Sequence, residues 1–504
     1  MNVVDRLVGW FSPRAGCERI RYREALRNYD ANHSDRFGNW RPPPSLSPER
    51  TDAPHRNAIR GKARDLERNN DITQGVIGAL ERNVVGTGIH PQALVVSRGG
   101  VDQYRINDRL EELWAEWTRK ENCDITGCSS FYDIQRMFVR RKQVDGEVFV
   151  LIVAAPDEKI PFKLQVVEPD LLAEDVYESN GHKVHGGVEV DEYMKPVAYH
   201  FRLDEGMQNI VRVEASRAIH SFWKTRPQQL RGISGFAGSM ERVRDIGEYI
   251  DAELKAARAA AANTGVVVSG KGAADSFGRS RRGADGERLE EIHVGMMNYV
   301  TQGDDVKFPQ PGRPNVNAAG FITAIMRMIG IAGGLSYEVV SRDLSQVNYS
   351  SARQGHLEDR RTYQAWQLDL IDNLCRPVWK AFVESAVLAG LIQAPGYWND
   401  KERYQKARWV APGWPWIDPQ KEATAAEKQL NLGIVTLAEI CGSQGRDWQE
   451  TLEQRKREQD YIEELGLKLG GTSAEPPADQ NDDKEGEDDD TRPKKPVVPD
   501  DEGD

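Results

Sequence analysis

Few residue patterns in this chain have the spacing that catalysis or phosphate binding requires. Ser221-Phe-Trp-Lys224 matches a pattern in which a lysine activates a nucleophilic serine, but the companion S-D-N and K-T-G elements are missing. Gly86-Thr-Gly88 lacks the third glycine of a dinucleotide-binding loop, and Gly270-Lys271 lacks the spacing of a phosphate-binding loop. The sequence therefore gives no positive case for an enzyme, and we expect no ATP hydrolysis by this chain.

Candidate metal ligands are similarly sparse. His182 and His185 stand beside glycines in GHKVHGG (181–187), where exposed loop histidines are the more common interpretation. Cys123 and Cys128 are the only close cysteine pair; their spacing is wider than that of a zinc knuckle, and no second pair follows. We expect reduced thiols at all five cysteines, with no metal site and no cofactor.

The composition is that of a globular protein with several structural units. The chain has 504 residues, of which 39% are hydrophobic and 29% are charged, and this length suggests roughly two to four units. No apolar run approaches the roughly 20 residues that span a bilayer, and the N-terminal sequence lacks the apolar segment of a signal peptide. We expect no membrane role and a cytoplasmic location where the chain is made.

The net charge of −12 is unevenly distributed. Residues 471–504 hold thirteen Asp and Glu against four Lys and Arg, with no aromatic residue, which predicts a disordered acidic tail. The remaining body has a net charge of only −3. Tight binding to DNA phosphates needs clustered Lys and Arg. The mildly acidic body therefore argues against tight DNA binding, although it does not exclude a surface past which DNA slides.

The first half is predicted to contain an extended arm and a small α+β unit. The prolines of RPPPSLSP (41–48) exclude regular structure, and we interpret residues 1–55 as an arm. GHKVHGG is expected to form a hairpin turn. Apolar periodicity predicts helices, and β-rich runs predict strands; the helices are expected at 56–85, 101–119 and 129–143, and the strands at 148–155, 164–169 and 196–203.

A long helix predicted at 236–262 carries a narrow apolar seam. Its seam residues recur near a spacing of 3.5 residues and are Met240, Val243, Ile250, Leu254, Ala257 and Ala261. An ordinary core helix and a seam packed against like helices both account for this periodicity. Small residues in its last turns would permit close approach of neighbouring backbones.

A basic insert follows at 265–312, where we expect strands around 291–300 and 305–308. Its candidate docking cations are Lys271, Arg279, Arg281, Arg282 and Arg288. A solvated loop and a docking surface for an acidic partner are both compatible with this charge.

The next part of the chain is predicted to be largely helical. A helix at 317–332 leads through Gly333-Gly334 into an irregular, polar segment. A long helix then spans 351–390 and should kink at Pro377, because proline removes one donor and clashes with the preceding turn.

The C-terminal part begins with a Trp-rich stretch at 396–419, which cannot be helical through its prolines and should fill a core or an interface. Thr436 and Glu439 have the spacing of a capping box. Asp447-Trp-Gln-Glu450 looks like a second helix start, and a mostly polar helix is expected to run to about residue 466.

Several segments, taken in order, resemble the lambda-type family of phage portal proteins. The resemblance covers about residues 20–460. Its most specific parts are DLSQVNYSSAR and PGWPWIDPQKE. Further matching segments are ERNVVGTG within 60–93, RRKQVDGEVFV (140–150), VVEPDLL (166–172), the 220–261 segment that begins HSFWK, and GIVTLAEICGSQGRDW within 433–458.

This resemblance implies an α+β, mainly helical portal fold with wing, stem, clip and crown regions, assembled as a ring, usually of twelve subunits, around an axial channel. By position, the regions are the arm 1–55, the wing 56–235, the stem helix 236–263, the clip 264–315, the second stem helix 316–333, the tunnel loop 334–350, the returning wing 351–425, the crown 426–470 and the tail 471–504.

The resemblance also implies roles for the candidate residues. The tunnel loop would face the DNA channel with Arg342, Asp343, Ser345, Gln346 and Asn348; its mixed charge could touch a duplex without clamping it. The stem seam would pack neighbouring subunits, and the clip cations would dock partner proteins.

The implied function is that of a conduit at the capsid vertex of the virion, through which double-stranded DNA is packaged and ejected without sequence preference. The implied partners are further copies of the chain, the terminase large subunit, a head-completion or connector protein, and the capsid and scaffolding proteins, with assembly in the host cytoplasm. The residues alone leave two alternatives: a cytosolic nucleic-acid-processing enzyme with an unrecognised site, and a monomeric scaffolding or adaptor protein.

Overall fold

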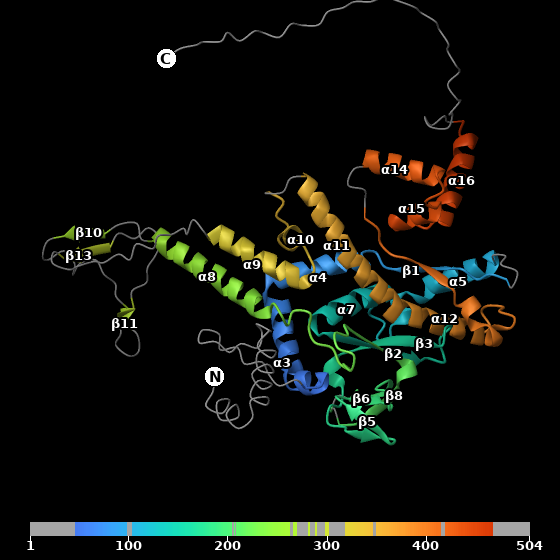
Figure 1. The fold of residues 1–504 in the computed structure, drawn as a ribbon, viewed down its shortest axis with the longest axis horizontal. Helices are drawn as coiled ribbons and strands as arrows, with labels where there is room; N and C mark the ends of the chain where they lie inside the picture. Colours follow the sequence, from blue (N-terminus) through green and yellow to red (C-terminus); the bar gives the residue numbers. More distant parts are fainter. Residues whose placement is uncertain are drawn as a thin grey trace, which may run out of the picture. The chain divides into compact units, whose positions relative to one another are not determined.

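The computed structural model of the protein shows a mainly helical α+β structure (Figure 1). The chain divides into two units, residues 1–446 and 447–504. In the first unit, helices and a five-stranded sheet pack on opposite faces of a three-stranded sheet. The expected fold class is confirmed. The described residues are 46–97, 103–203, 206, 208–262, 266–269, 281–282, 288–289, 298–301, 318–345, 349–414 and 419–466.

The first helix, α3 (Pro48–Asn69), begins earlier than predicted. Pro48 lies in its first turn, where proline is tolerated because the missing N–H would have no helical partner there. Residues 48–55, which we expected in the extended arm, are therefore helical.

The helix predicted over 56–85 is interrupted at Asn70. The Asn70 backbone is extended, and its Oδ1 accepts a hydrogen bond from the Thr73 N–H (3.0 Å), so Asn70 caps a new helix, α4 (Asp71–Leu80). A π-helical turn (Glu81–Val85) follows and stops at Gly86, as predicted. Gly86 has a φ of +49°, which favours glycine.

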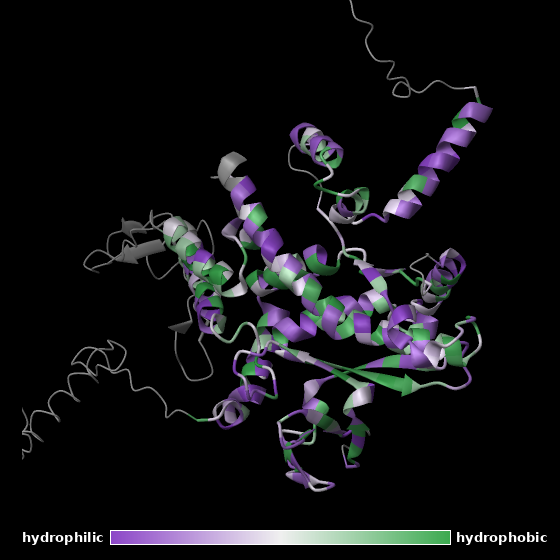
Figure 2. Cartoon of the chain, turned by 45° about the vertical axis from the view of Figure 1, so that its right-hand side comes forward, coloured by the Kyte–Doolittle hydropathy of each residue, from purple (hydrophilic) through white to green (hydrophobic). Residues whose placement is uncertain are grey.

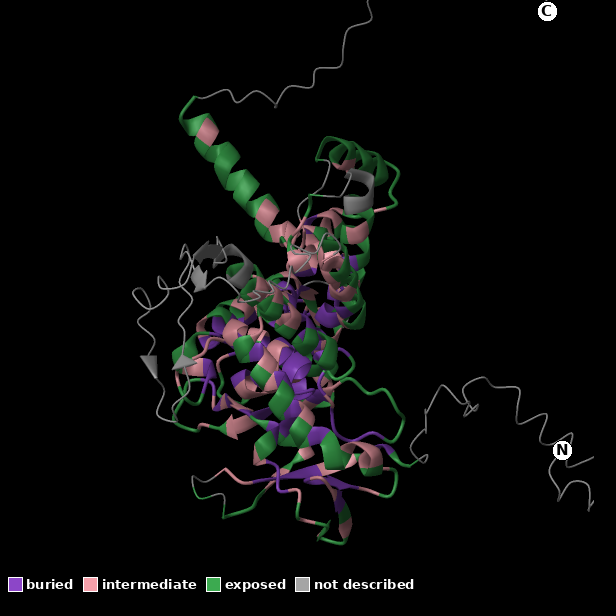
Figure 3. Cartoon of the chain, turned by 90° about the vertical axis from the view of Figure 1, so that its left-hand side faces the viewer, coloured by how far each residue is buried: buried purple, intermediate pink, exposed green. Residues whose placement is uncertain are grey.

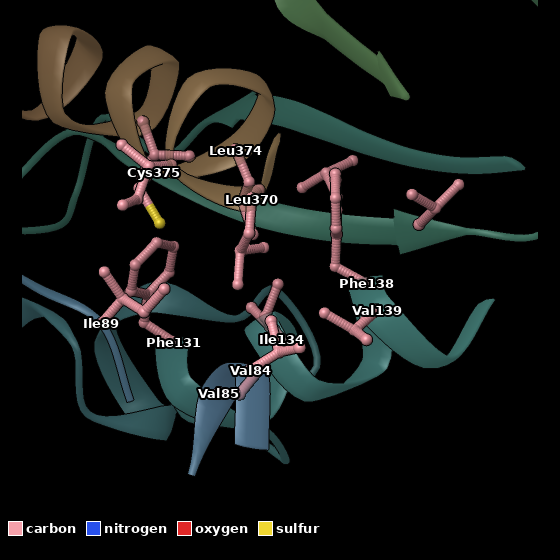
Figure 4. Close-up of a cluster of buried hydrophobic side chains, with 14 of the residues drawn as sticks. Val84, Val85, Ile89, Phe131, Ile134, Phe138, Val139, Leu370, Leu374 and Cys375 are labelled. Atoms are coloured by element: carbon pink, nitrogen blue, oxygen red, sulfur yellow. The ribbon is translucent and has the colours of Figure 1, made fainter. Parts of the chain in front are cut away.

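A second π-helical turn (Ile371–Cys375) joins α11 (Tyr349–Leu370) to α12 (Arg376–Leu388). We expected a kink at Pro377. The chain accommodates the proline with a widened turn, in which the Arg376 N–H bonds to the Ile371 carbonyl five residues back. Side chains of both π turns lie in one buried cluster with α7 (Phe131–Val144) (Figure 4).

The three-stranded sheet explains the apolar run at 148–155. β2 (Glu147–Ala154) is its central strand, and β3 (Phe162–Val167) and β9 (Ala218–Phe222) flank it antiparallel. Alternate side chains point to opposite faces, so Val148 and Val150 join the helical core, whereas Phe149 and Leu151 join the core of the second sheet. Both faces of β2 are thus buried, and its apolar colouring is visible in Figure 2.

The second sheet overturns one prediction. GHKVHGG does not form a hairpin turn; His182–His185 is a strand between two turns. Asn180-Gly181 and Gly186-Gly187 all have positive φ, as two-residue hairpin turns require. The sheet is antiparallel throughout, and its strands in order are β4 (Glu178–Ser179), β5 (His182–His185), β6 (Val188–Val190), β7 (Pro196–Phe201) and β8 (Val211–Glu214).

Aromatic side chains join α5 (Tyr104–Trp117) to α7 and α12. The Trp114 ring lies 5.2 Å from the rings of Phe131 and Trp379. In the Trp-rich stretch, β14 (Ala407–Val410) pairs antiparallel with β1 (His90–Ala93), and Trp409 packs 6.4 Å from Trp379. Short helices complete this part of the fold: α6 (Lys120–Cys123), Pro169–Leu171, Ala215–Arg217, Tyr397–Asn399 and α13 (Lys401–Tyr404).

Three helices follow the Trp-rich stretch. α14 (Pro419–Asn431) begins before the boundary at 425/426 that we placed by position. α15 (Leu437–Ser443) starts with the predicted capping box, in which Thr436 Oγ1 accepts from the Glu439 N–H (3.2 Å). In the second unit, α16 (Trp448–Glu464) is capped by Asp447 and has no buried residue (Figure 3).

The cysteines in the described ranges are free thiols. Cys123 is buried and Cys128 is exposed, and burial raises the pKa of the Cys123 thiol to about 12. No group of three His, Cys, Asp or Glu in the described ranges could hold a metal ion. None of the described helices combines the length and the apolar character needed to cross a membrane.

A buried carboxylate connects α3, the three-stranded sheet and the segment that follows β9. Glu147, at the start of β2, has no exposed surface. Its oxygens accept hydrogen bonds from Arg231 Nη2 (2.7 Å), Arg60 Nη2 (3.0 Å) and the Gly232 N–H (3.0 Å), and contact His220 Nε2 (3.2 Å). Burial alone would raise the pKa of Glu147, but Arg231 and His220 hold it well below its usual value.

Acidification should weaken this cluster in two stages. Burial lowers the pKa of His220 below 6.5 despite its contact with Glu147, so below pH 6.5 the unfolded chain gains a proton first and the free energy of unfolding falls. The depressed pKa of Glu147 adds a second loss below pH 4.5. In urea unfolding measurements, the stability difference between wild type and His220→Gln should therefore shrink below pH 6.5.

The exposed His55 on α3 provides a matched control. The same measurement on His55→Gln shows what replacing a surface histidine does, and the change in His220→Gln is compared with it. A pH-independent difference between wild type and His220→Gln would contradict the role of His220 in the cluster.

Candidate functional site

Two neighbouring helices form the first element of the candidate site. α8 (Met240–Ala262) leads away from the body of the first unit, and α9 (Ala318–Gly333) returns beside it (Figure 1). The rings of Tyr249 and Phe321 pack across this pair with centroids 5.3 Å apart. We call α8 and α9 together the helical hairpin.

The predicted seam of α8 divides into a buried and an exposed part. Met240 and Val243, near the start of the helix, are buried in the core of the chain itself. Further along, Ile250 and Leu254 are 40% and 47% exposed, and Ala257 is exposed too. Contacts within one chain therefore bury only the seam residues in the first turns of α8.

α9 carries a second exposed apolar stripe. Its residues are mostly apolar, and Arg327 is its only charged residue. Nevertheless, the side chains of Phe321, Met328 and Ile331 are 51%, 53% and 77% exposed. Their spacing of i, i+7 and i+10 places them on one helix face, away from the buried Ile329. Exposed apolar surface that is contiguous, rather than scattered, marks an interaction site.

The described residues between the two helices form four short strands. β10 (Val266–Ser269) pairs in parallel with β13 (Asn298–Thr301), which overlaps the strand predicted at 291–300. β11 (Arg281–Arg282) pairs antiparallel with β12 (Arg288–Leu289), and Arg282 stands opposite Arg288. Three predicted docking cations thus share one strand pair. The strand predicted at 305–308 lies outside the described residues.

α9 ends in a tight turn. Gly334 is left-handed, with a φ of +66°, and the Leu335 N–H bonds back to the Gly330 carbonyl (2.9 Å), as in a Schellman motif. Gly330 has no room for a side chain, because a Cβ there would lie 2.6 Å from the Leu335 oxygen. The following segment therefore lies directly against the last turn of α9.

The segment that we predicted to be irregular contains a helix, α10 (Tyr337–Ser341). Ser336 caps it, and its Oγ accepts from the Val339 N–H (3.4 Å). Val340 is buried, and its carbonyl lies close to Gly75 of α4. A Cβ added to Gly75 would lie 3.1 Å from the Val340 oxygen. α10 is thus packed against both α4 and α9.

Three predicted channel residues follow α10 in one turn. Arg342 is exposed and left-handed, with a φ of +56°. The Asp343 carboxylate accepts from the Ser345 N–H (3.0 Å) and the Tyr337 hydroxyl (3.2 Å), and hydrogen bonds from Ser345 lower the pKa of Asp343. Leu344 is 58% exposed. The turn therefore presents a cation and an apolar side chain, while its carboxylate is engaged locally.

Sequence reasoning missed several residues that hold this turn in place. In α11, Asp359 bonds to Ser336, and Thr362 bonds to the Gly334 carbonyl. Local sequence patterns cannot predict partners that are so distant in the sequence. Ser336 could have been predicted as a helix cap, because serine is a favoured N-cap residue and Ser336 comes shortly after Gly333-Gly334. Lys271, Arg279, Gln346 and Asn348 lie outside the described part of the chain, as do the side chains of Ala261, Arg281, Arg282 and Arg288.

The family described as "Phage portal protein, lambda family" matches residues 33–367, about two thirds of the chain. The chain belongs to the lambda family of phage portal proteins. The match includes the helical hairpin, α10 and most of α11. The predicted resemblance is confirmed. The role that defines this family is structural rather than catalytic, in agreement with the expectation that the chain is not an enzyme.

Individual relatives from phages agree with this family. A protein of Halomonas phage phiHAP-1, named "Probable portal protein", is 28% identical over 422 residues, which cover 81% of each chain. "Portal protein B" of Escherichia phage lambda is 23% identical over 495 residues, covering 88% of this chain and 92% of the relative.

Solved structures of gene transfer agent particles are also similar to this portal-family chain. One, of the neck of the native particle, matches with a TM-score of 0.36 and 12% identity over 75% of this chain and 91% of the other. Another, of the virion, has a TM-score of 0.38 and 14% identity over 78% and 93%.

The close approach at Gly330 generates a stability prediction. Gly330→Ala would force its Cβ against the Leu335 oxygen and should lower the free energy of unfolding by about 1–3 kcal/mol. Gly320, in the same helix, has open space around its Cα, so Gly320→Ala should raise that free energy by about 0.4–1 kcal/mol. Urea unfolding of the two variants should thus give opposite signs. A loss of stability no larger in Gly330→Ala than in Gly320→Ala would contradict the packing of α10 on α9.

Proposed function

We propose that identical copies of this chain associate side by side in a closed ring, whose axial channel admits DNA to the capsid and releases it. Membership of the portal family supports the general role, and the exposed apolar stripes of the helical hairpin support the mode of assembly. The ring would occupy a capsid vertex of the virion after assembly in the host cytoplasm. A stoichiometry of twelve remains the expectation.

The apolar stripes are the observation that carries the ring. Burying a side chain such as Met328 or Ile331 contributes roughly 1.5–3 kcal/mol, and a single chain leaves both more than half exposed. Ile250 and Leu254 add exposed apolar surface on α8. If these stripes meet a different face of the next copy, the interface is heterologous, and such interfaces close into rings when the rotation permits.

The regions follow the family arrangement. The wing would comprise the part from α3 to residue 235 and the later part from α11 to β14. The helical hairpin would form the stem, and the strands between its two helices would form the clip. We place the start of the crown at Pro419 rather than at 426, because α14 is continuous across that boundary. The turn after α10 would be the part of the tunnel loop nearest the DNA.

The tunnel loop would contact DNA weakly. Arg342 is free to approach a phosphate, whereas Asp343 is held by its own neighbours. One cation per subunit beside a local carboxylate gives few phosphate contacts of the kind that release counterions and hold DNA tightly. Such a loop could touch a moving duplex without stopping it.

The clip would dock partner proteins. Arg281, Arg282 and Arg288 lie on one strand pair, and repetition around a ring would give a cationic band suited to acidic partner surfaces. We propose the terminase large subunit during packaging and a head-completion or connector protein afterwards. Contacts with capsid and scaffolding proteins would fall on other surfaces.

Charged substitutions on the α9 stripe should test the ring. Met328→Glu combined with Ile331→Glu would place charges in the proposed interface, and sedimentation velocity should show a shift from ring to free subunits. Tyr193→Glu is the control, because Tyr193 is 82% exposed but lies in a turn of the five-stranded sheet. Intact rings in the double variant would exclude this face of α9 from the interface.

The tunnel loop should affect DNA handling but not assembly. Deleting residues 342–348, or replacing Arg342 with Ala, should leave rings visible in electron micrographs while reducing packaged or retained DNA severalfold, as measured by nuclease protection in filled particles. Arg361→Ala serves as the control, because Arg361 is an exposed arginine of α11 outside the loop. Normal DNA content in the deletion variant would rule out this assignment of the loop.

A further inference from the structure

The base of the turn after α10 is tied to α11 by a buried carboxylate. Asp359 of α11 is only 3% exposed. Its Oδ1 accepts from the Ser336 N–H (2.7 Å), and its Oδ2 accepts from the Ser336 hydroxyl (2.6 Å). Both carboxylate oxygens thus bind the one residue that caps α10, so they fix its orientation as well as its distance.

A third bond from α11 holds the same segment. Thr362, about one turn after Asp359, donates from Oγ1 to the Gly334 carbonyl (2.7 Å). The three bonds hold the segment on both sides of the buried Leu335. In contrast, the bonds of the Asp343 carboxylate run to Tyr337 and Ser345, within the loop itself.

α11 is in turn anchored in the core. Tyr363, Trp366 and Leu370 are buried along it. Asp369 bonds to Lys142 Nζ of α7 (2.6 Å), and the buried Lys142 lies 4.1 Å from the centre of the Trp223 ring. A chain of buried contacts therefore leads from the sheet and α7 through α11 to the cap of α10.

We propose that Asp359 is the positioning residue of the tunnel loop: its bonds to Ser336 set where Arg342 is held, and through α11 they transmit the position of the wing to the loop. An ionised acceptor makes stronger hydrogen bonds than a neutral one, and burial excludes competing water. The functional consequence rests on the proposed portal role, but the structural coupling does not.

The coupling is testable by amide hydrogen exchange on the full-length ring. Asp359→Ala should speed exchange of the amides at 336–341 by about tenfold, the effect of losing hydrogen bonds to a charged group. Asp359→Asn should rescue part of the protection, because its side-chain oxygen can still accept from the Ser336 N–H. The amides of β2 should exchange as in wild type.

Glu358 supplies the matched control. It precedes Asp359 on α11, is exposed, and pairs with Arg361 on the surface (2.9 Å). Glu358→Ala should leave exchange at 336–341 unchanged. Equal exchange in Asp359→Ala and Glu358→Ala would overturn the proposal.

DNA retention in filled particles gives the functional readout. Asp359→Ala should form normal rings but retain severalfold less DNA, Asp359→Asn should be intermediate, and Glu358→Ala should be normal. Faster loop exchange with normal retention in Asp359→Ala would overturn the positioning role, provided that the 342–348 deletion impairs retention. If that deletion also retains DNA normally, the tunnel-loop assignment fails instead.

Discussion

The Glu147 carboxylate joins α3 and the three-stranded sheet to the segment that leads into the helical hairpin. Removing such a charge from water is costly, and it is tolerated because Arg231, Arg60, His220 and the Gly232 amide surround it. Gly232 in turn packs against Gly146. A Cβ added to Gly232 would lie 2.1 Å from the Gly146 carbonyl oxygen. This buried cluster therefore holds the chain at Arg231 and Gly232, shortly before α8 begins.

The first unit combines a well-packed core with surfaces that the chain itself leaves exposed. Buried aromatic and aliphatic side chains fill the space between the helices and the sheet. The outer hairpin exposes apolar residues instead, and the turn after α10 exposes Arg342 and Leu344. The turn is held from α11, and α10, which precedes the turn, also packs on α9 of the hairpin. The two exposed elements therefore share part of their support.

Local patterns predicted the elements whose determinants are local. The apolar run of β2, the helix stop at Gly86 and the capping box at Thr436 all rest on neighbouring residues. The failures have different causes. GHKVHGG holds two short turns rather than one, and the cap of α10 depends on Asp359, which is distant in sequence. Periodicity on α8 could not tell the buried Val243 from the exposed Leu254, because both satisfy the same spacing.

The wide sequence separation of the Glu147 partners has a consequence for biosynthesis. Arg60 precedes Glu147 by 87 residues and Arg231 follows it by 84, so the cluster can close only after nearly half of the polypeptide has left the ribosome. α8 and α9 emerge after that moment. α11 and α12, which fill the helical core, emerge later still. The apolar faces of α8 and α9 are therefore exposed on the nascent chain before that core can be completed, at a stage when exposed apolar surface favours aggregation.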